Sequence, residues 1–255
     1  MSIDDPNTAP GADEASTWPV AERLDGVRAV PPVHRTLVAS HAPGGHGAEA
    51  YRTLYTSLRA ARQGAPLGIL GVASPARGDG RSTTAANLAF VAARETGREV
   101  ALVDADLRRP GLHHLLGIDG ELGLSDVLSN RADDEAALWR HPGGVAFVAG
   151  GRPEPEPARR LRHPRWLRFL GMLRARFDEV IIDLPPLALA ESRQLLGHCD
   201  GAVLVVRAGR TMPAHVREAL GEGLPAALYG MVLNAASEAD APMLATVRRA
   251  LPKGA

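Results

Sequence analysis

Short apolar runs alternate with helical segments along most of this 255-residue chain. Each run has the length of a strand and is apolar at nearly every position, as in strands whose two faces are both buried. The six runs lie at residues 67–72, 100–103, 145–148, 180–182, 202–206 and 229–233. Amphipathic periodicity predicts helices at 48–62, 133–140, 161–176, 190–197, 213–221 and 241–250, besides one that follows the first strand. This alternation predicts an α/β fold, in which a mostly parallel sheet carries helices on both faces.

A glycine loop joins the first predicted strand to the next helix. The loop carries Gly78 and Gly80, and alanine and leucine then recur at helical spacing until Gly97, which can end the helix. In a strand, glycine loop and helix of this kind, backbone N–H groups of the loop and of the first helical turn converge on one anion. The layout is that of a phosphate-binding site, with the hydroxyl of Ser82 in reach of a magnesium ion.

The loop matches the P-loop pattern G-x-x-x-x-G-K-[ST] in part. Gly80 and Ser82 fit the pattern, whereas Pro75 stands at the first glycine position and Arg81 at the lysine position. These residues alone leave two alternatives open, nucleotide binding and an ordinary strand-to-helix turn. Residues elsewhere in the chain have to decide between them.

Aspartates follow two other predicted strands. Asp104 ends the run at 100–103 and Asp106 comes two residues later, while Asp183 ends the run at 180–182. The carboxyl ends of parallel strands meet at one edge of the sheet, so these carboxylates are expected beside the glycine loop. An aspartate at a strand end can also cap the loop or helix that follows. Three of them beside a phosphate site favour a nucleotide and Mg²⁺ site, in which one carboxylate can accept a proton.

Charge and composition bear on the partners. The chain holds 29 basic and 29 acidic residues, and aromatic residues make up 4% of it, so neither bulk charge nor base stacking favours nucleic acid. The arginine-rich segment 158–176 carries an apolar stripe, which favours a solvated helix over a nucleic-acid or membrane patch. No apolar stretch reaches the ~18 residues of a membrane span, and the start does not read as a secretory signal. We therefore expect a cytoplasmic protein with no nucleic-acid partner.

The chain divides into two parts. Residues 1–47 are rich in proline, glycine, alanine and acidic residues without periodicity, and predict a disordered N-terminal arm. Residues 48–255 hold all of the predicted strands and are expected to form one nucleotide-binding domain. Its first helix, at 48–62, carries Tyr51 and Tyr55 on an apolar face that is expected to pack on the sheet or on a neighbouring subunit.

Several motifs resemble those of the bacterial tyrosine kinases of capsule and exopolysaccharide synthesis, the BY-kinases of the CpsD/CapB type. VALVDADLRRPGLHHLLG at 100–117 resembles the family's second Walker motif, called A′, and FDEVIIDLPP at 177–186 resembles its Walker B motif. The resemblance continues through GLSDVL at 123–128, a glycine- and proline-rich stretch at 150–155, CDGAVLVVRAGRT at 199–211 and GMVLN at 230–234. It spans residues 48–235, and the motifs stand in the family's order.

The resemblance implies a P-loop fold related to cell-division and partition ATPases, with transfer of a phosphoryl group from ATP to tyrosine. It implies ATP and Mg²⁺ as cofactors, a loop that binds the phosphates and an A′ aspartate that activates the acceptor hydroxyl. The cofactor-binding residues by this correspondence are Gly78, Asp79, Gly80, Arg81, Ser82, Thr83 and Asn234, the last near the base. The metal ligands are Ser82, Asp104, Asp106 and Asp183, and the catalytic residues are Asp104, Asp106 and Arg81.

The chain departs from the family pattern at four places. Arg81 replaces the lysine of the Walker A loop, and a guanidinium presents its charge as a fork rather than as a point. The acidic residue expected about nine positions after Asp183 is replaced by Ser192, with Glu191 beside it. The oligomerisation motif E-x-x-R-x-x-R has Tyr55 at its last position. The C-terminal segment lacks the tyrosine cluster that the family's kinases phosphorylate.

Three functional hypotheses follow. In the first, the chain is a cytoplasmic MgATP-dependent tyrosine kinase that regulates exopolysaccharide or capsule synthesis and chain length. A membrane-embedded co-polymerase or chain-length protein would activate it at the inner face of the membrane, and it would form a homo-oligomer. In the second, it is a non-catalytic pseudokinase scaffold of the polysaccharide export machinery, which Arg81 favours and the retained aspartates oppose. The third, a positioning ATPase of the partition type, expects a second lysine where this chain has Ala76.

Overall fold

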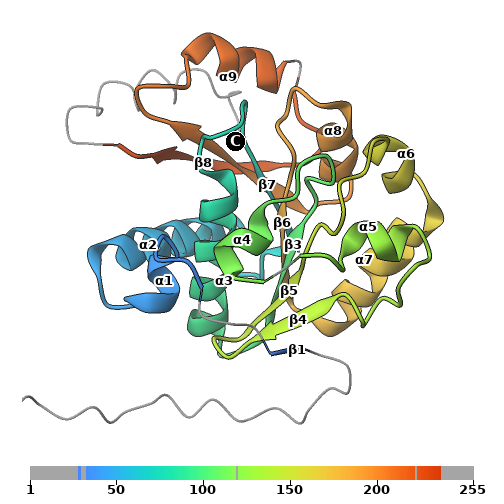
Figure 1. Cartoon of the computed structure of the whole chain (residues 1–255). Coiled ribbons are helices and arrows are strands. Elements are labelled where there is room, and N and C mark those ends of the chain that lie inside the picture. Colours follow the sequence, from blue (N-terminus) through green and yellow to red (C-terminus); the bar gives the residue numbers. More distant parts are fainter. Residues whose placement is uncertain (1–27, 30–32, 119, 222, 237–255) are drawn as a thin grey trace, which may run out of the picture.

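The predicted apolar runs form most of one sheet, and two further strands extend it. The computed structural model describes residues 28–29, 33–118, 120–221 and 223–236. Its strands are β1 (Arg28–Ala29), β2 (Gly68–Ala73), β3 (Val100–Asp104), β4 (Leu138–His141), β5 (Val145–Val148), β6 (Glu179–Asp183), β7 (Gly201–Arg207) and β8 (Leu228–Asn234). They lie in the order β1-β4-β5-β3-β6-β2-β7-β8 (Figure 1). All neighbours run parallel except β4 and β5, so the predicted mostly parallel sheet is confirmed.

Helices cover both faces of this sheet. They are α1 (Val38–His41), α2 (His46–Ala61), α3 (Arg81–Thr96), α4 (Leu112–Leu116), α5 (Leu124–Leu128), α6 (Pro157–Leu161), α7 (Pro164–Arg176), α8 (Ala190–Leu196) and α9 (Pro213–Leu220). Side chains of α1 to α4 share one apolar cluster with the sheet, and those of α5 to α9 share the other. Figure 1 accordingly has α1 and α2 on one side of the strands and α5 and α7 on the other. Among the described residues, no helix combines the length and the apolar character needed to cross a membrane.

The helix α3 packs closely on the sheet because alanine dominates its inner face. Ala85, Ala89 and Ala92 are fully buried, and their small side chains let the helix and strand backbones approach. The helix ends at Gly97, whose φ of 68° is left-handed and whose N–H donates to a carbonyl of the last turn. Gly97 therefore ends this helix as predicted, and α3 begins at Arg81, directly after the glycine loop.

The helix predicted at 133–140 is wrong. Leu138–His141 instead form β4, which runs antiparallel to β5 with Trp139 opposite Phe147. This pairing buries Leu138 and Trp139, and so short a segment has no periodicity that separates a helix from a strand. The helix predicted at 241–250 lies outside the described residues.

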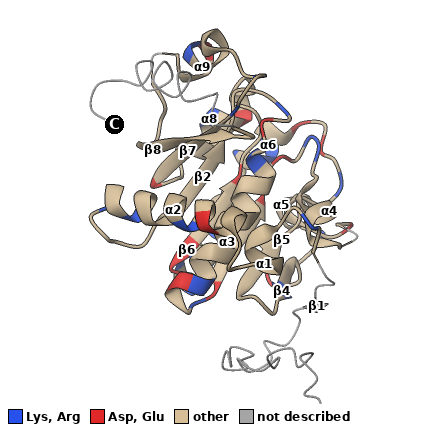
Figure 2. Ribbon diagram, turned by 90° about the vertical axis from the view of Figure 1, so that its left-hand side faces the viewer, with Lys and Arg blue, Asp and Glu red and all other residues tan. Residues whose placement is uncertain are grey.

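The arginine-rich segment forms two helices rather than the single one predicted at 161–176. Pro164 takes the first position of α7, where a residue without an N–H is tolerated. The arginines pair with acidic side chains of neighbouring loops: Arg160 with Glu154, Arg168 with Asp134 and Arg176 with Glu135. Figure 2, which views the molecule from the side of α1 and α2, shows both signs of charge along the ribbon there as well. This segment is therefore part of a charge-balanced surface.

The domain boundary predicted at residue 47 is too late. Residues 33–47, which were expected to be disordered, pack on α3: they contain α1, and Leu37 is fully buried. Asn87 of α3 accepts a hydrogen bond from the Ala39 N–H at 3.0 Å and donates one to another backbone carbonyl of the segment. A few buried contacts hold these residues, whereas their composition alone resembles that of a flexible arm. The other residues of the predicted arm, apart from the strand β1, lie outside the described part of the chain.

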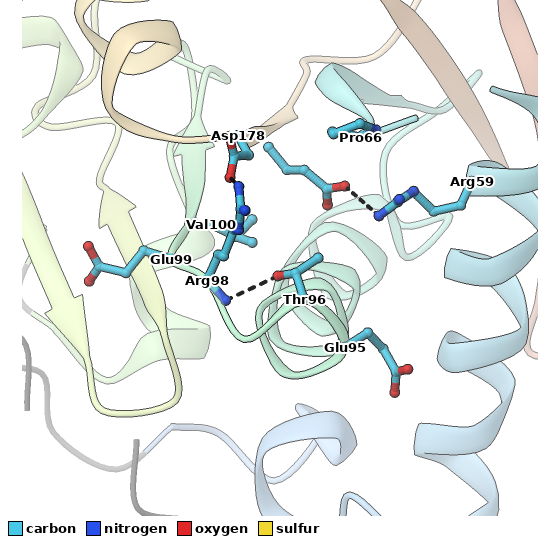
Figure 3. A pocket seen from close by; sticks show the side chains of 9 residues that line it. Arg59, Pro66, Glu95, Thr96, Arg98, Glu99, Val100 and Asp178 are labelled. Carbon is cyan, nitrogen blue, oxygen red and sulfur yellow. Dashed lines mark hydrogen bonds and ion pairs between the residues drawn. The ribbon is translucent and has the colours of Figure 1, made fainter. Parts of the chain in front are cut away.

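The helix α2 packs on the sheet through a buried tyrosine. The hydroxyl of Tyr55 donates to Glu179 Oε1 at 3.1 Å and accepts from Arg59 at 2.9 Å. Burial raises the pKa of Tyr55 to about 12. Arg59 and Glu179 border a cavity of about 350 Å³ at the amino ends of β3 and β6, where Figure 3 also shows the ion pair of Arg98 and Asp178. Ion pairs thus line the edge of the sheet that lies opposite the glycine loop.

Replacing Leu37 by alanine is expected to lower the free energy of unfolding by about 2–5 kcal/mol, because the change leaves a cavity beneath a fully buried side chain. Urea unfolding followed by circular dichroism measures the effect. Leu167→Ala is the matched control, because Leu167 on α7 is 56% exposed and its loss should change stability by less than about 0.5 kcal/mol. Equal effects of the two changes would contradict the packing of residues 33–47 on the domain.

Candidate active site

The glycine loop between β2 and α3 needs glycine at two positions. Gly78 has a φ of 82° and Gly80 a φ of 94°, both in the left-handed region that side chains disfavour. A Cβ on Gly80 would also lie 1.8 Å from Nδ2 of Asn234. That amide, at the end of β8, donates to the Asp79 carbonyl at 2.9 Å. The structure therefore brings Asn234 against the loop, although the two are far apart in the sequence.

Asp79 holds the shape of the loop from inside. Its side chain is buried, with Oδ2 accepting from the Ala76 N–H at 3.0 Å and Oδ1 accepting from the Thr211 hydroxyl at 2.7 Å. The carboxylate is thus engaged within the protein and faces away from the cavity that the loop borders. A direct contact of Asp79 with a nucleotide stays a prediction.

A cavity of about 430 Å³ opens at the carboxyl ends of the strands. Its lining residues come from the glycine loop, from α3, from the last residues of β3, β6 and β7 and from the segment that follows β3. They are Ser74, Ala76, Arg77, Gly78, Gly80, Arg81, Ser82, Thr83, Asp104, Asp106, Arg109, Gly111, Leu115, Asp183 and Arg207. The structure therefore brings together every predicted site residue except Asp79 and Asn234, which lie behind the loop.

Arg81 points at carboxylates rather than along the loop. Its Nε donates to Asp183 Oδ1 at 2.7 Å and its Nη2 to Asp106 Oδ2 at 3.3 Å, and the side chain is only 8% exposed. Burial lowers the pKa of Arg81, but Asp183 and then Asp106 outweigh this effect and raise it, so the guanidinium stays charged. Its charge neutralises two buried carboxylates, and burying them without a partner would be costly.

Asp104 and Asp183 lie side by side because β3 and β6 are paired with these two residues in register. Asp104 is fully buried and accepts three backbone hydrogen bonds, one from Asp106 at 3.1 Å and one each from Gly111 and Leu112 at 3.0 Å. Burial and the neighbouring Asp183 raise the pKa of Asp104 to about 7. Burial also raises the pKa of Asp183, although Arg81 opposes the shift.

The donor set suits a magnesium ion that arrives with a nucleotide. No group of three acidic, histidine or cysteine side chains among the described residues could hold a metal ion alone. Asp106 was expected to bind the same ion as Asp104 and Asp183. In this structure it pairs instead with two arginines, with Arg77 at 3.1 Å and with Arg81. Ser82 lies close enough to Asp183 to lower the pKa of that carboxyl group, and Mg²⁺ commonly takes one or two protein oxygens besides phosphates and water.

Sequence analysis missed Arg207 as a functional candidate and noted Glu191 only as the neighbour of Ser192. Glu191 is buried and its Oε1 lies 2.5 Å from Nε of Arg108, so the acidic group missing at Ser192 is present one residue earlier. The hydroxyl of Ser192 instead donates to carbonyls of the proline pair that follows β6. Arg207, at the end of β7, lines the cavity directly. Its place after an apolar run, at the same edge as the aspartates, is the signal that could have identified it.

Replacing Arg81 by methionine is expected to lower the free energy of unfolding by about 3–5 kcal/mol, because Asp183 and Asp106 lose a buried partner. Urea unfolding without nucleotide or Mg²⁺ measures this loss. Since Arg81 lowers the pKa of Asp183, that pKa rises further in the variant, and protonation removes the unpaired charge as the pH falls. The deficit should therefore be smaller at pH 5 than at pH 8.

Arg94→Met is the matched control, because Arg94 lies on the same helix and is exposed. It should change stability by less than about 0.5 kcal/mol at both pH values. An Arg81 variant as stable as this control, or a deficit that grows toward pH 5, would contradict the assigned ion pairs.

Comparison of sequences identifies relatives over most of the domain, although no family model matches the chain. The tyrosine-protein kinase YwqD of Bacillus subtilis is 33% identical over 207 residues, which cover 79% of this chain and 86% of YwqD. The putative tyrosine-protein kinase EpsB of Ralstonia solanacearum is 34% identical over 186 residues, which cover 72% of this chain. The matched part is 25% of EpsB, so the chain spans about a quarter of that relative's length.

Comparison of structures gives a consistent result. The kinase domain of the Escherichia coli tyrosine kinase ETK superposes with a TM-score of 0.68 and 26% identity, over 82% of this chain and 91% of that domain. The septum site-determining protein MinD of Pyrococcus horikoshii, solved with Mg-ADP, gives a TM-score of 0.57 and 26% identity, over 72% of this chain and 76% of MinD. The fold is thus that of P-loop ATPases related to MinD. Because the chain is 33% identical to YwqD and covers 86% of it, the chain belongs to the family of bacterial tyrosine-protein kinases.

Proposed function

We propose that this chain binds MgATP and transfers a phosphoryl group from ATP to a tyrosine side chain. The observation that carries the proposal is the cavity of about 430 Å³, which the glycine loop and three aspartates line together. Phosphoryl transfer depends mainly on positioning and on neutralising charge, and these are the groups that do both. The names of the relatives, tyrosine-protein kinases, support the choice of acceptor.

The loop and the first turn of α3 would hold the phosphates. Their N–H groups are free of helical partners, and the amino end of a helix attracts anions. Gly78, Gly80 and Thr83 border the cavity at this point, and Asn234 behind the loop is the candidate contact for the base. Ser82 and Asp183 would hold Mg²⁺, which neutralises phosphate charge when bound, with Asp104 and Asp106 completing the predicted ligand set.

Asp104 is the candidate proton acceptor. Its pKa of about 7, raised by burial, means that the carboxylate is available near neutral pH and is basic enough to take a proton. Three backbone N–H groups fix its orientation. In the proposed step, the tyrosine oxygen attacks the γ-phosphorus, the tyrosine proton passes to Asp104 and ADP departs with the electrons of the broken P–O bond. Asp106 lies two residues after Asp104 and is itself held by Arg77 and Arg81.

The acceptor is expected on another protein. Tyr55 is buried, and the Tyr229 hydroxyl donates to the Asp200 carbonyl at 2.6 Å, so both are engaged within the fold. We propose a membrane-embedded polysaccharide co-polymerase as activator and acceptor, which would recruit the chain to the inner face of the membrane. Through it the kinase would regulate the length of an exopolysaccharide or capsule chain. A homo-oligomer formed through the motif residues of α2 would have to break the ion pairs that Arg52 makes with Glu49 and Glu95 and replace them with pairs between subunits.

A non-catalytic scaffold is the second candidate function. The observation that favours it is Arg81, whose charge is taken up by Asp183 and Asp106. Such a pseudokinase would serve the polysaccharide export machinery by binding alone. The buried Asp104, whose raised pKa suits proton transfer, favours the kinase instead.

Asp104→Asn is expected to lower the rate of phosphoryl transfer at least about 100-fold, because an amide cannot accept the tyrosine proton. The measurement is transfer of radiolabelled phosphate from ATP to the tyrosines of a co-purified co-polymerase. MgATP affinity should change much less than the rate. The matched control is Asp133→Asn on an exposed loop, which should transfer phosphate at the wild-type rate.

Two results would contradict the kinase proposal. One is an unchanged transfer rate in Asp104→Asn. The other is absence of transfer by the wild-type chain to any component of polymer synthesis, together with normal polymer output from an Asp183→Asn strain. The second result would leave the scaffold as the better account.

A further inference from the structure

Two of the four described arginines that line the candidate nucleotide cavity, Arg77 and Arg81, are paired with carboxylates. Arg81 pairs with Asp183 and Asp106, and Arg77 also pairs with Asp106. Arg108 pairs with Glu191. A triphosphate needs positive charge beside it, and a guanidinium held by carboxylates contributes less of it. The position of the Walker lysine therefore supplies little net charge for the phosphates in this chain.

Arg207 differs from these arginines. It lines the same cavity, and in the described part of the chain its guanidinium has no carboxylate partner. Its Nη1 donates to the Gly78 carbonyl at 3.1 Å, so the group lies on the glycine loop itself. A guanidinium has five N–H donors, and this contact leaves the others free for phosphate oxygens.

The backbone of Arg207 is tied to the same loop. Its N–H donates to the Thr211 hydroxyl at 2.9 Å, and that hydroxyl donates to Asp79 Oδ1 at 2.7 Å. Asp79 in turn accepts from the Ala76 N–H. This series of hydrogen bonds fixes the backbone at the end of β7 relative to the loop. The exposed Arg207 side chain therefore starts beside the loop and reaches the Gly78 carbonyl.

A second guanidinium reinforces the charge at this point. A Cβ added to Gly78 would lie 2.6 Å from Nη1 of Arg210, so the Arg210 side chain lies against the loop where only glycine leaves room. Arg109 also lines the cavity, but it follows β3, and its backbone N–H donates to Asp106 Oδ1 at 3.2 Å. Among the described arginines that line the cavity, Arg207 is therefore the one whose guanidinium bonds to the loop and has no carboxylate partner.

We propose, building on the proposed function, that Arg207 supplies the phosphate-binding charge that the Walker lysine position does not, while Arg81 serves as the counter-charge of Asp183 and Asp106. Arg210 adds a second positive charge beside the same loop. In this chain the phosphate-binding charge thus comes from the end of β7 instead of the start of α3. The ligand class is a nucleoside di- or triphosphate, recognised through its phosphates.

Calorimetric titration of the full chain with MgADP and MgATP tests this proposal. Arg207→Gln should weaken binding about tenfold or more, as expected for the loss of a charged hydrogen bond. Affinity for adenosine should be unchanged, and the salt dependence of MgATP binding should decrease. Arg81→Lys should leave the affinity for MgADP within a few-fold of wild type. Arg217→Gln is the matched control, because Arg217 is an exposed arginine of the neighbouring helix α9, and it should bind as the wild type does.

The outcomes separate this proposal from the proposed function. A wild-type chain that binds neither nucleotide would overturn the proposed function and this assignment with it. Wild-type binding that is unchanged in Arg207→Gln would overturn the assignment of Arg207 alone. An Arg81→Lys variant that stays folded and binds MgADP tenfold more weakly would also overturn it, because Arg81 would then contact the phosphates in the wild type. Circular dichroism melts of each variant confirm that a weaker binder is still folded.

Discussion

The guanidinium of Arg81, between Asp183 and Asp106, is the interaction on which the candidate site depends. All three side chains are buried, and carboxylates in such a position require a cation or a proton. Arg81 is the first residue of α3, so its ion pairs also attach the start of this helix to the ends of β6 and β3. The glycine loop that precedes Arg81 is thereby held against the aspartates.

The strand order explains why these groups meet. β6 lies between β2 and β3, and all three are parallel, so the segments that follow them emerge at one edge of the sheet. The phosphate loop follows β2, Asp104 ends β3 and Asp183 ends β6. β7 lies on the other side of β2 and brings Arg207 to the loop from there. The chemistry therefore draws on four neighbouring strands, and each contributes through the few residues at its carboxyl end.

Much of this could be predicted from the sequence, because it depends on local patterns. The apolar runs predicted their strands, and Gly97 predicted the end of α3, since burial on two faces and a left-handed cap both leave a signal in single segments. Parallel strands share an edge, so Asp104 and Asp183 could be assigned to one site. The direction of the Arg81 side chain could not be predicted, because it depends on carboxylates about 25 and 102 positions away. β4 and the buried Leu37 were missed for the same reason, since partners elsewhere in the fold decide them.

A crystal structure of the chain with Mg²⁺ and a non-hydrolysable ATP analogue would test the central claim most directly. The account predicts phosphates against the N–H groups of residues 78–83, with the Arg207 guanidinium on their oxygens and Arg81 still bonded to Asp183. A triphosphate contacted by Arg81 instead, with Arg207 turned to solvent, would contradict the claim that Arg207 rather than Arg81 supplies the phosphate-binding charge. Nucleotide bound elsewhere, with the loop empty, would contradict the site itself.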